Sequence, residues 1–256
     1  KFYASSSKTK RRLIMEKLYH YCSTDTFFKI LNSKTIWMSD IFSMNDYLEF
    51  IWFFEIIKKH KESKFYDMVF RIIQEKLNNE NFVFISCFSE ESDLLSQWRG
   101  YSDDGKGFSI GFNKSILEQL GSLEKIQYCS LSSVPQTITD EINIDLSGEI
   151  GLARLSFEYN QLIEKYAPIV KNHKFSEESE WRIIEKIPKK SDLSNIKWRN
   201  SSDKVVPYIE KHFEKELISE IIIGPKNHTT IENMELFLKS VGFENVSVIK
   251  SEISYR

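Results

Sequence analysis

Apolar segments typical of β-strands are interleaved with segments of helical spacing, and this pattern constrains the fold more than any other feature of the chain. The segment 82–89 (FVFISCFS) is almost continuously apolar, as in a buried strand. Phe108, Ile110 and Phe112 alternate onto one face of another expected strand. Because strands and helices do not alternate strictly, the pattern predicts one α+β domain over residues 15–256, with a mixed β-sheet in two parts and helices packed around it.

The same patterns place the individual elements. Strands are expected at 17–22, 34–39, 82–89, 107–113, 125–131, 176–188, 205–213, 218–226 and 245–253. Helices are expected at 25–33, 47–57, 66–79, 92–101, 152–167 and 229–242. Suitable helix caps are Thr24, Asn45 or Asp46, Ser92 or Asp93, and Gly242 at a C-terminus. Pro207 predicts an edge or a bend in its strand.

Composition excludes several classes of protein. Nine glycines among 256 residues argue against a nucleotide-binding fold that depends on repeated glycine loops. A net charge of −2 gives no sign of the basic surface that binds nucleic acid. Three cysteines without C-x-x-C spacing indicate reduced thiols of a cytosolic protein and make zinc, or any other metal, an unexpected cofactor. No apolar run reaches the ~18 residues of a membrane span. Residues 1–14 form a polar, basic lead-in that is expected to lie outside the fold.

Two of four polar clusters lie in the first fifth of the chain. Alternation places His20 on one strand face and Tyr19 and Tyr21 on the other. A histidine there can bind a ribose hydroxyl or act as a base, or it can simply be held by a backbone carbonyl. In the second cluster, Asn45–Glu49, Asp46 and Glu49 can face a cleft from one helical turn, or can be acids favoured by the helix dipole.

The third cluster is Gln97, Trp98, Arg99 and Tyr101, at the end of a short helix. An arginine beside aromatic rings suits a diphosphate or a planar ring, although a core tryptophan with an outward arginine gives the same pattern.

The fourth cluster is Glu178, Glu180 and Arg182. Residues two apart at a strand start share a face, so both carboxylates can enter one site and stabilise an oxocarbenium-like transition state. The alternative is an acidic turn with an exposed ion pair that contributes little to stability.

Taken in order, these clusters resemble the bacterial domain of unknown function 2971 family. The matching elements are LYHYCS, KTIWMSDIFSMNDYLEF, CFSEESDLLSQWRGYSDDGKGFSIGF, EESEWRI and EIIIGPK, which run from Leu18 to Lys226. The family name assigns no activity.

The order of a histidine in a first strand, an aromatic strand–helix segment and Glu-x-Glu before a strand is also similar to the ADP-ribosyltransferase superfamily. That resemblance implies an ADP-ribosyltransferase-like fold and NAD as a substrate. His20 would contact a ribose, Tyr101 or Trp98 would stack on nicotinamide, Glu180 would orient the nicotinamide ribose, and Glu178 would help to position the acceptor. Further candidates for NAD contacts are Tyr21, Ser39 and Arg99, and Arg182 is a candidate neighbour of the acids.

From this resemblance we expect a bacterial, cytoplasmic transferase that uses NAD and acts as a toxin or an anti-phage defence effector. Its acceptor would be an unknown macromolecule or small molecule. Two other functions stay open. One is a non-catalytic module of the same fold that binds a ligand or a partner. The other is a metal-dependent nuclease-type toxin that uses Asp46 and Glu49 and requires a third acid.

Overall fold

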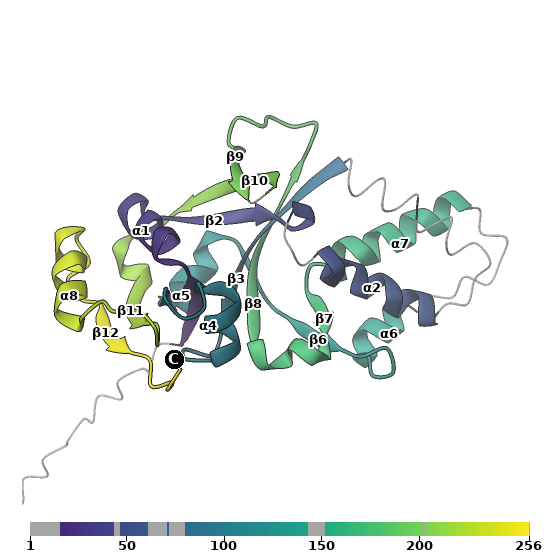
Figure 1. Ribbon diagram of the computed structural model, residues 1–256. Coiled ribbons are helices and arrows are strands. Elements are labelled where there is room, and N and C mark those ends of the chain that lie inside the picture. The colour runs from purple at the N-terminus through teal and green to yellow at the C-terminus, as the bar shows by residue number, and fades with distance from the viewer. Residues whose placement is uncertain are drawn as a thin grey trace, which may run out of the picture.

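The computed structural model describes residues 16–43, 47–60, 71, 80–142, 152–201 and 203–255, and these hold the elements drawn in Figure 1. The strands are β1 (Lys17–Cys22), β2 (Thr35–Asp40), β3 (Asn81–Ser89), β4 (Phe108–Asn113), β5 (Ser122–Lys125), β6 (Gln127–Cys129), β7 (Val170–Asn172), β8 (Glu180–Pro188), β9 (Lys197–Ser201), β10 (Lys204–His212), β11 (Ile218–Ile223) and β12 (Ser247–Lys250). The α-helices are α1 (Thr24–Ser33), α2 (Tyr47–His60), α4 (Leu95–Tyr101), α5 (Lys114–Leu117), α6 (Gln136–Ile142), α7 (Leu152–Tyr166) and α8 (Ile231–Ser240). Short 3-10 helices are η1 (Ile41–Ser43), η2 (Glu118–Leu120), η3 (His173–Glu178) and η4 (Lys215–Leu217).

Among the described residues, ten strands form one large sheet, and β6 and β7 form a small parallel pair. The order along the large sheet is β12-β11-β4-β1-β3-β2-β10-β9, with β8 and then β5 attached to β3. Its pairs are antiparallel except for β11 with β12. The predicted mixed α+β fold with helices around a large mixed sheet is therefore confirmed.

The sheet forks at β3, and this fork positions the site. One edge of β3 pairs with β8 along its full length. The opposite edge is shared, because β2 pairs with it only at Phe84 and Ile85 and β1 only at Ser89. In the described chain no strand pairs with that edge over residues 86–88, so β1 and β2 diverge there. Helix α1 joins these two parallel strands across the gap.

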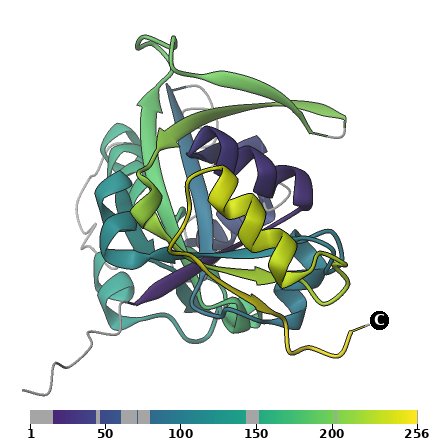
Figure 2. The same ribbon diagram turned by 90° about the vertical axis from the view of Figure 1, so that its left-hand side faces the viewer.

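Two apolar clusters lie on opposite sides of β3, as strand alternation requires. Phe84 and Phe88 pack in the main core with residues of α1 and α8, and Figure 2 shows these two helices in front of the sheet. Val83 and Ile85 pack in the second core with residues of α2, α6 and α7, which gather on one side in Figure 1. The predicted face of β4, with Phe108, Ile110 and Phe112, lies in the main core.

Helix ends follow the expected chemistry at some positions and not at others. The cap of α1 is Ser23 rather than Thr24, because the Ser23 hydroxyl accepts from the Thr26 backbone N–H. At α8, Gly242 has φ of 89°, and the Phe243 N–H donates to the Leu238 carbonyl, as in a Schellman motif. The predicted C-terminal glycine is therefore confirmed.

Helix α4 has no side-chain cap, contrary to the expectation for Ser92 or Asp93. The Asp93 carboxylate instead accepts from the Trp98 indole N–H at 2.6 Å, from the Ser251 hydroxyl at 2.6 Å and from the Glu252 backbone N–H at 2.8 Å. It therefore links α4 to the C-terminal segment, a role that local sequence does not reveal.

The glycine turn after α4 allows close backbone approach. A Cβ atom at Gly107 would lie 2.0 Å from the Cys22 carbonyl oxygen and 2.8 Å from the Ser102 hydroxyl. The Gly224 N–H donates to the Gly107 carbonyl at 3.1 Å, which joins this turn to the turn after β11. Gly107 thus lets the chain leave α4 and enter the sheet directly beside β1.

The strand prediction at 125–131 needs correction. The segment is divided, because β5 pairs with β8 whereas β6 pairs with β7. Strand β10 has β9 and β2 as neighbours, but its pairing with β2 begins at Tyr208, so among the described strands Pro207 is paired on one side only, as expected of a proline at an edge. The expected helix at 66–79 and the lead-in 1–14 lie outside the described residues, apart from the helical residue Arg71.

Candidate functional site

A cavity of about 550 Å³ lies at the fork of the sheet. Its walls come from β1, α1, β2, β3, α4, η3, β8 and β9, so segments far apart in the sequence meet there. The lining residues are Tyr19, His20, Tyr21, Asp25, Thr26, Lys29, Ile30, Trp37, Ser39, Ile85, Ser86, Cys87, Phe88, Ser89, Gln97, Tyr101, Glu178, Glu180, Arg199 and Asn200. The cavity exists because β1 and β2 diverge beside residues 86–88, whose backbone edge has no partner among the strands that the structure describes.

His20 crosses the gap in the sheet. Its Nδ1 lies 2.9 Å from the Cys87 carbonyl oxygen, and because a carbonyl only accepts, Nδ1 carries the proton. Burial lowers the pKa of His20, while the Cys87 bond partly opposes this effect, so the ring is neutral at pH 7. A neutral ring protonated at Nδ1 presents Nε2 as a hydrogen-bond acceptor. His20 therefore has both a structural bond and an acceptor at the cavity.

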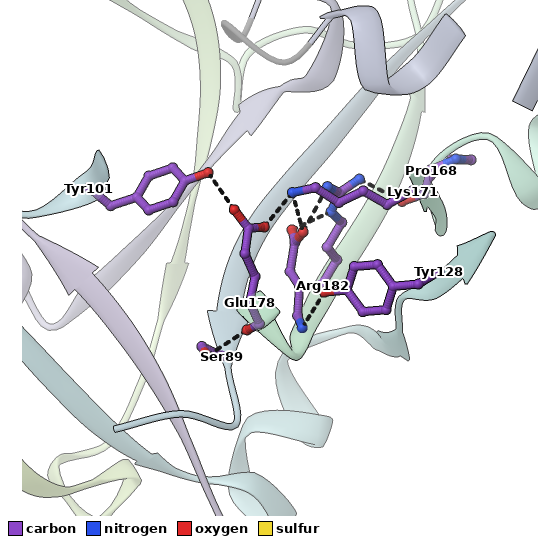
Figure 3. Close-up of polar contacts among 8 residues, drawn as sticks. Ser89, Tyr101, Tyr128, Pro168, Lys171, Glu178 and Arg182 are labelled. Atoms are coloured by element: carbon purple, nitrogen blue, oxygen red, sulfur yellow. Dashed lines mark hydrogen bonds and ion pairs between the residues drawn. The ribbon is translucent and has the colours of Figure 1, made fainter. Parts of the chain in front are cut away.

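Four charged side chains form a buried cluster beside the cavity, drawn in Figure 3. Lys171 Nζ lies 2.5 Å from Glu178 Oε2 and 3.0 Å from Glu180 Oε2. Arg182 donates through Nε and Nη2 to the two oxygens of Glu180, at 2.6 and 3.1 Å, and through Nη1 to the Pro168 carbonyl at 2.9 Å. Two cations thus balance two carboxylates, as burial requires.

Local turns position the two acids. Glu178 ends η3, Ser179 follows with φ of 44°, and Glu180 begins β8. The Ser89 hydroxyl donates to the Glu178 carbonyl at 2.6 Å, and the Glu180 N–H donates to the Tyr128 hydroxyl at 2.8 Å. The expectation that both acids reach one site from one strand face is therefore wrong in its geometry, because only Glu180 is in the strand, but both acids line the cavity.

The charge state of Glu180 follows from its neighbours. Burial opposes ionisation, but Arg182 and Lys171 outweigh it and hold the pKa of Glu180 at about 2. Burial and the nearby Glu180 carboxylate raise the pKa of the Cys87 thiol well above its usual value. At neutral pH, Glu180 is therefore ionised and Cys87 remains a thiol, which is a poor nucleophile.

Tyr101 brings an aromatic ring to the acidic wall. Its hydroxyl donates to Glu178 Oε1 at 3.4 Å, and Figure 3 shows its side chain extending from α4 toward Glu178. Tyr101 as a whole residue is 45% exposed, and it lines the cavity. Tyr101 can therefore both stack on a planar group and hold Glu178 in place.

Two neighbours in the same helix lie elsewhere. Trp98 is fully buried, packs edge-on against Tyr21 at 4.9 Å, and does not line the cavity. Arg99 also lies off the cavity, with its guanidinium 5.8 Å from the Tyr255 ring centre. Tyr21 does line the cavity, although its hydroxyl is engaged with the backbone at Glu91 and Leu94. The arrangement of a core tryptophan with an outward arginine is the one found.

Sequence reasoning missed Lys171, Arg199 and Trp37. Lys171 lies in the short strand β7 and belongs to the charged cluster beside the cavity, although it does not line the cavity itself. Arg199 and Trp37 do line the cavity, and Arg199 Nη2 donates to the Ser39 hydroxyl at 3.1 Å. Ser39, a sequence candidate, thus supports an arginine at the cavity.

The structure does not place the side chains of the cluster Asn45–Glu49 at any site. Asn45 and Asp46 lie outside the described residues, and Glu49 is described only by its position in α2. Within the described ranges, no three His, Cys, Asp or Glu side chains are grouped so as to hold a metal ion. None of the helices described has the length and apolar character to cross a bilayer.

One family profile, described as "Protein of unknown function (DUF2971)", matches residues 97–183. The match begins in α4 and ends in β8, and it includes Tyr101, Lys171 and both cavity acids. It supports the resemblance to this family that the sequence motifs predict. No curated protein and no solved structure matches the chain.

Proposed function

We propose that the chain is an ADP-ribosyltransferase-like protein that binds NAD in the fork cavity. The observation that carries this proposal is the convergence of His20, Tyr101, Glu178 and Glu180 on one cavity. These residues come from three distant parts of the chain. A volume of about 550 Å³ lies within the range of small-molecule and cofactor sites.

Each group has a role that its environment supports. The His20 Nε2 acceptor suits a ribose hydroxyl, and a partly exposed tyrosine that lines the cavity, Tyr101, suits stacking on nicotinamide. In the reaction, the bond between the ribose anomeric carbon and the nicotinamide nitrogen breaks, and its electron pair leaves with nicotinamide. An acceptor oxygen or nitrogen bonds to the same carbon and releases a proton. Ionised acids at the cavity wall stabilise the positive charge that develops on the ribose.

The proposal is tested by incubating the purified protein with NAD and measuring nicotinamide release by chromatography. Glu178→Gln and Glu180→Gln each remove one cavity carboxylate, and we expect either change to lower the rate at least ~100-fold. Glu177→Gln is the matched control, because Glu177 is exposed in η3 and lies off the cavity. A rate that is unchanged in both cavity variants would contradict the roles of these acids.

A second function, a non-catalytic binding module, is favoured by the bonding of Glu180. Both of its oxygens already accept from Arg182, and one also pairs with Lys171. A carboxylate neutralised in this way is a weak electrostatic partner for a positively charged transition state. This function predicts that NAD raises the melting temperature of the protein while no nicotinamide is released. The expected role as a toxin or defence effector stays a prediction.

A further inference from the structure

Arg199 lines the cavity from β9, and among the described residues no carboxylate pairs with it. Its Nη2 donates to the Ser39 hydroxyl at 3.1 Å, and its Nε is buried without a hydrogen-bond partner. No Asp or Glu in the described ranges forms an ion pair with it. The guanidinium is therefore a cation at the cavity whose bonding is incomplete.

Arg182 shows what a structural arginine looks like in the same protein. It bonds through Nε, Nη1 and Nη2, two of them to Glu180. A buried guanidinium nitrogen that is removed from water without a partner is costly, and a bound ligand or ion is one way in which such a group is completed. The difference between the two arginines indicates that Arg199 is a site for an anion rather than a link within the fold.

The cavity therefore has two electrostatically distinct walls. Glu178 and Glu180 belong to the wall formed by η3 and β8, whereas Arg199 belongs to β9, which is separated from β3 by the two strands β2 and β10. Lys29 also lines the cavity, but its ammonium is paired with Asp25 at 2.6 Å. Arg199 is thus the cation best able to take a ligand oxygen, and a guanidinium binds phosphate in a planar, two-pronged geometry.

We propose that Arg199, oriented by Ser39, forms an anion subsite that holds a phosphoryl group of the bound nucleotide. This inference rests on the proposed function in taking the ligand to be NAD or its ADP-ribose part. The ligand then spans the cavity, with its phosphate at Arg199 and the ribose that becomes positively charged at the acidic wall.

Calorimetric titration of the full chain with ADP-ribose and with inorganic pyrophosphate tests this subsite. We expect Arg199→Gln to weaken ADP-ribose binding about 10- to 100-fold, the range of a charge-assisted hydrogen-bond pair. Lys197→Gln is the matched control, because it removes the same charge from the same strand at an exposed residue off the cavity, and we expect a change of less than about 3-fold. Arg199→Gln loses only one internal hydrogen bond, so its melting temperature should match that of the Lys197 control.

The outcomes separate this inference from the proposed function. Equal ADP-ribose affinities of the two variants would overturn the subsite, even if the protein releases nicotinamide from NAD. Binding that depends on Arg199 without any nicotinamide release would support the subsite and count against the transferase. If pyrophosphate binds through Arg199 and ADP-ribose does not, the nucleotide ligand is wrong. If neither ADP-ribose nor pyrophosphate binds, the proposal as a whole is overturned.

Discussion

Lys171→Met tests whether the buried charges act as one coupled group. The substitution keeps a long side chain but removes the ammonium that lies 2.5 Å from Glu178 and 3.0 Å from Glu180. The pKa of Glu180 falls from an ordinary 4.5 to about 2, which corresponds to about 3 kcal/mol of stabilisation shared by Arg182 and Lys171. Losing Lys171 removes its share of this effect. It also leaves the buried carboxylates of Glu178 and Glu180 with one cation fewer to balance their charge.

We therefore expect Lys171→Met to lower the free energy of unfolding by about 3 kcal/mol at pH 7, at the lower end of the values for broken buried ion pairs. For a chain of this size the melting temperature should fall by roughly 6–12 °C. Urea unfolding followed by circular dichroism measures the change. Lys165→Met is the control, because Lys165 makes a comparable pair with Glu141 on the surface, where removal should have no measurable effect.

The pH dependence has a definite sign. Because its folded-state pKa is depressed, Glu180 stabilises the native protein above pH 4.5, and that contribution is lost as the pH falls toward 2. Without Lys171 the pKa of Glu180 rises, so the part of the difference that comes from Glu180 is lost only as the pH falls through the raised pKa toward 2, and the two proteins should differ less at about pH 2.5 than at pH 7. The double variant Lys171→Met/Glu178→Gln should recover about 1 kcal/mol or more. A Lys171 variant as stable as the Lys165 control at both pH values would refute the coupling.

Two further predictions concern the fork and the glycine turn. Burial lowers the pKa of His20 below 6.5, so unfolding takes up a proton and the stability of the native protein falls as the pH drops below 6.5. In urea titrations, His20→Gln should therefore lose less stability between pH 7 and pH 5 than the unchanged protein. An identical pH profile of the two proteins would contradict the buried neutral ring. Gly107→Ala places a Cβ 2.0 Å from the Cys22 carbonyl and should cost about 2 kcal/mol or more, whereas Gly100→Ala, with nothing within 4 Å of its Cβ, should be neutral or stabilising in thermal melts. Equal melting temperatures of the two alanine variants would show that the backbone beside Cys22 moves aside.

Local patterns predicted much of the secondary structure. The one-sided apolar face of β4 and the C-terminal glycine of α8 follow from periodicity and from backbone preferences within a few residues. Capping at α4 failed for a tertiary reason, because Asp93 is taken by the Trp98 indole and the C-terminal segment. Sequence spacing therefore predicts elements well but does not say which partner a polar side chain chooses.

The candidate site shows the same division. His20, Tyr101 and the two acids were candidates because their residue types suit ribose and nicotinamide chemistry. Their meeting at one cavity, and the placement of Trp98 and Arg99 away from it, depend on how β1 and β2 diverge from β3.

Periodicity and capping act over short distances along the chain, so the sequence by itself predicted most of the longer strands and helices and the residue types available for chemistry, but not β7, β9 or α6. Only the tertiary structure decided that β3 shares one edge between two strands, that a cavity opens between them, that Arg199 lines it, and that Lys171 pairs with its two acids. Strand pairing and the balance of buried charge join residues far apart in sequence, and their energies depend on the whole fold rather than on any one segment.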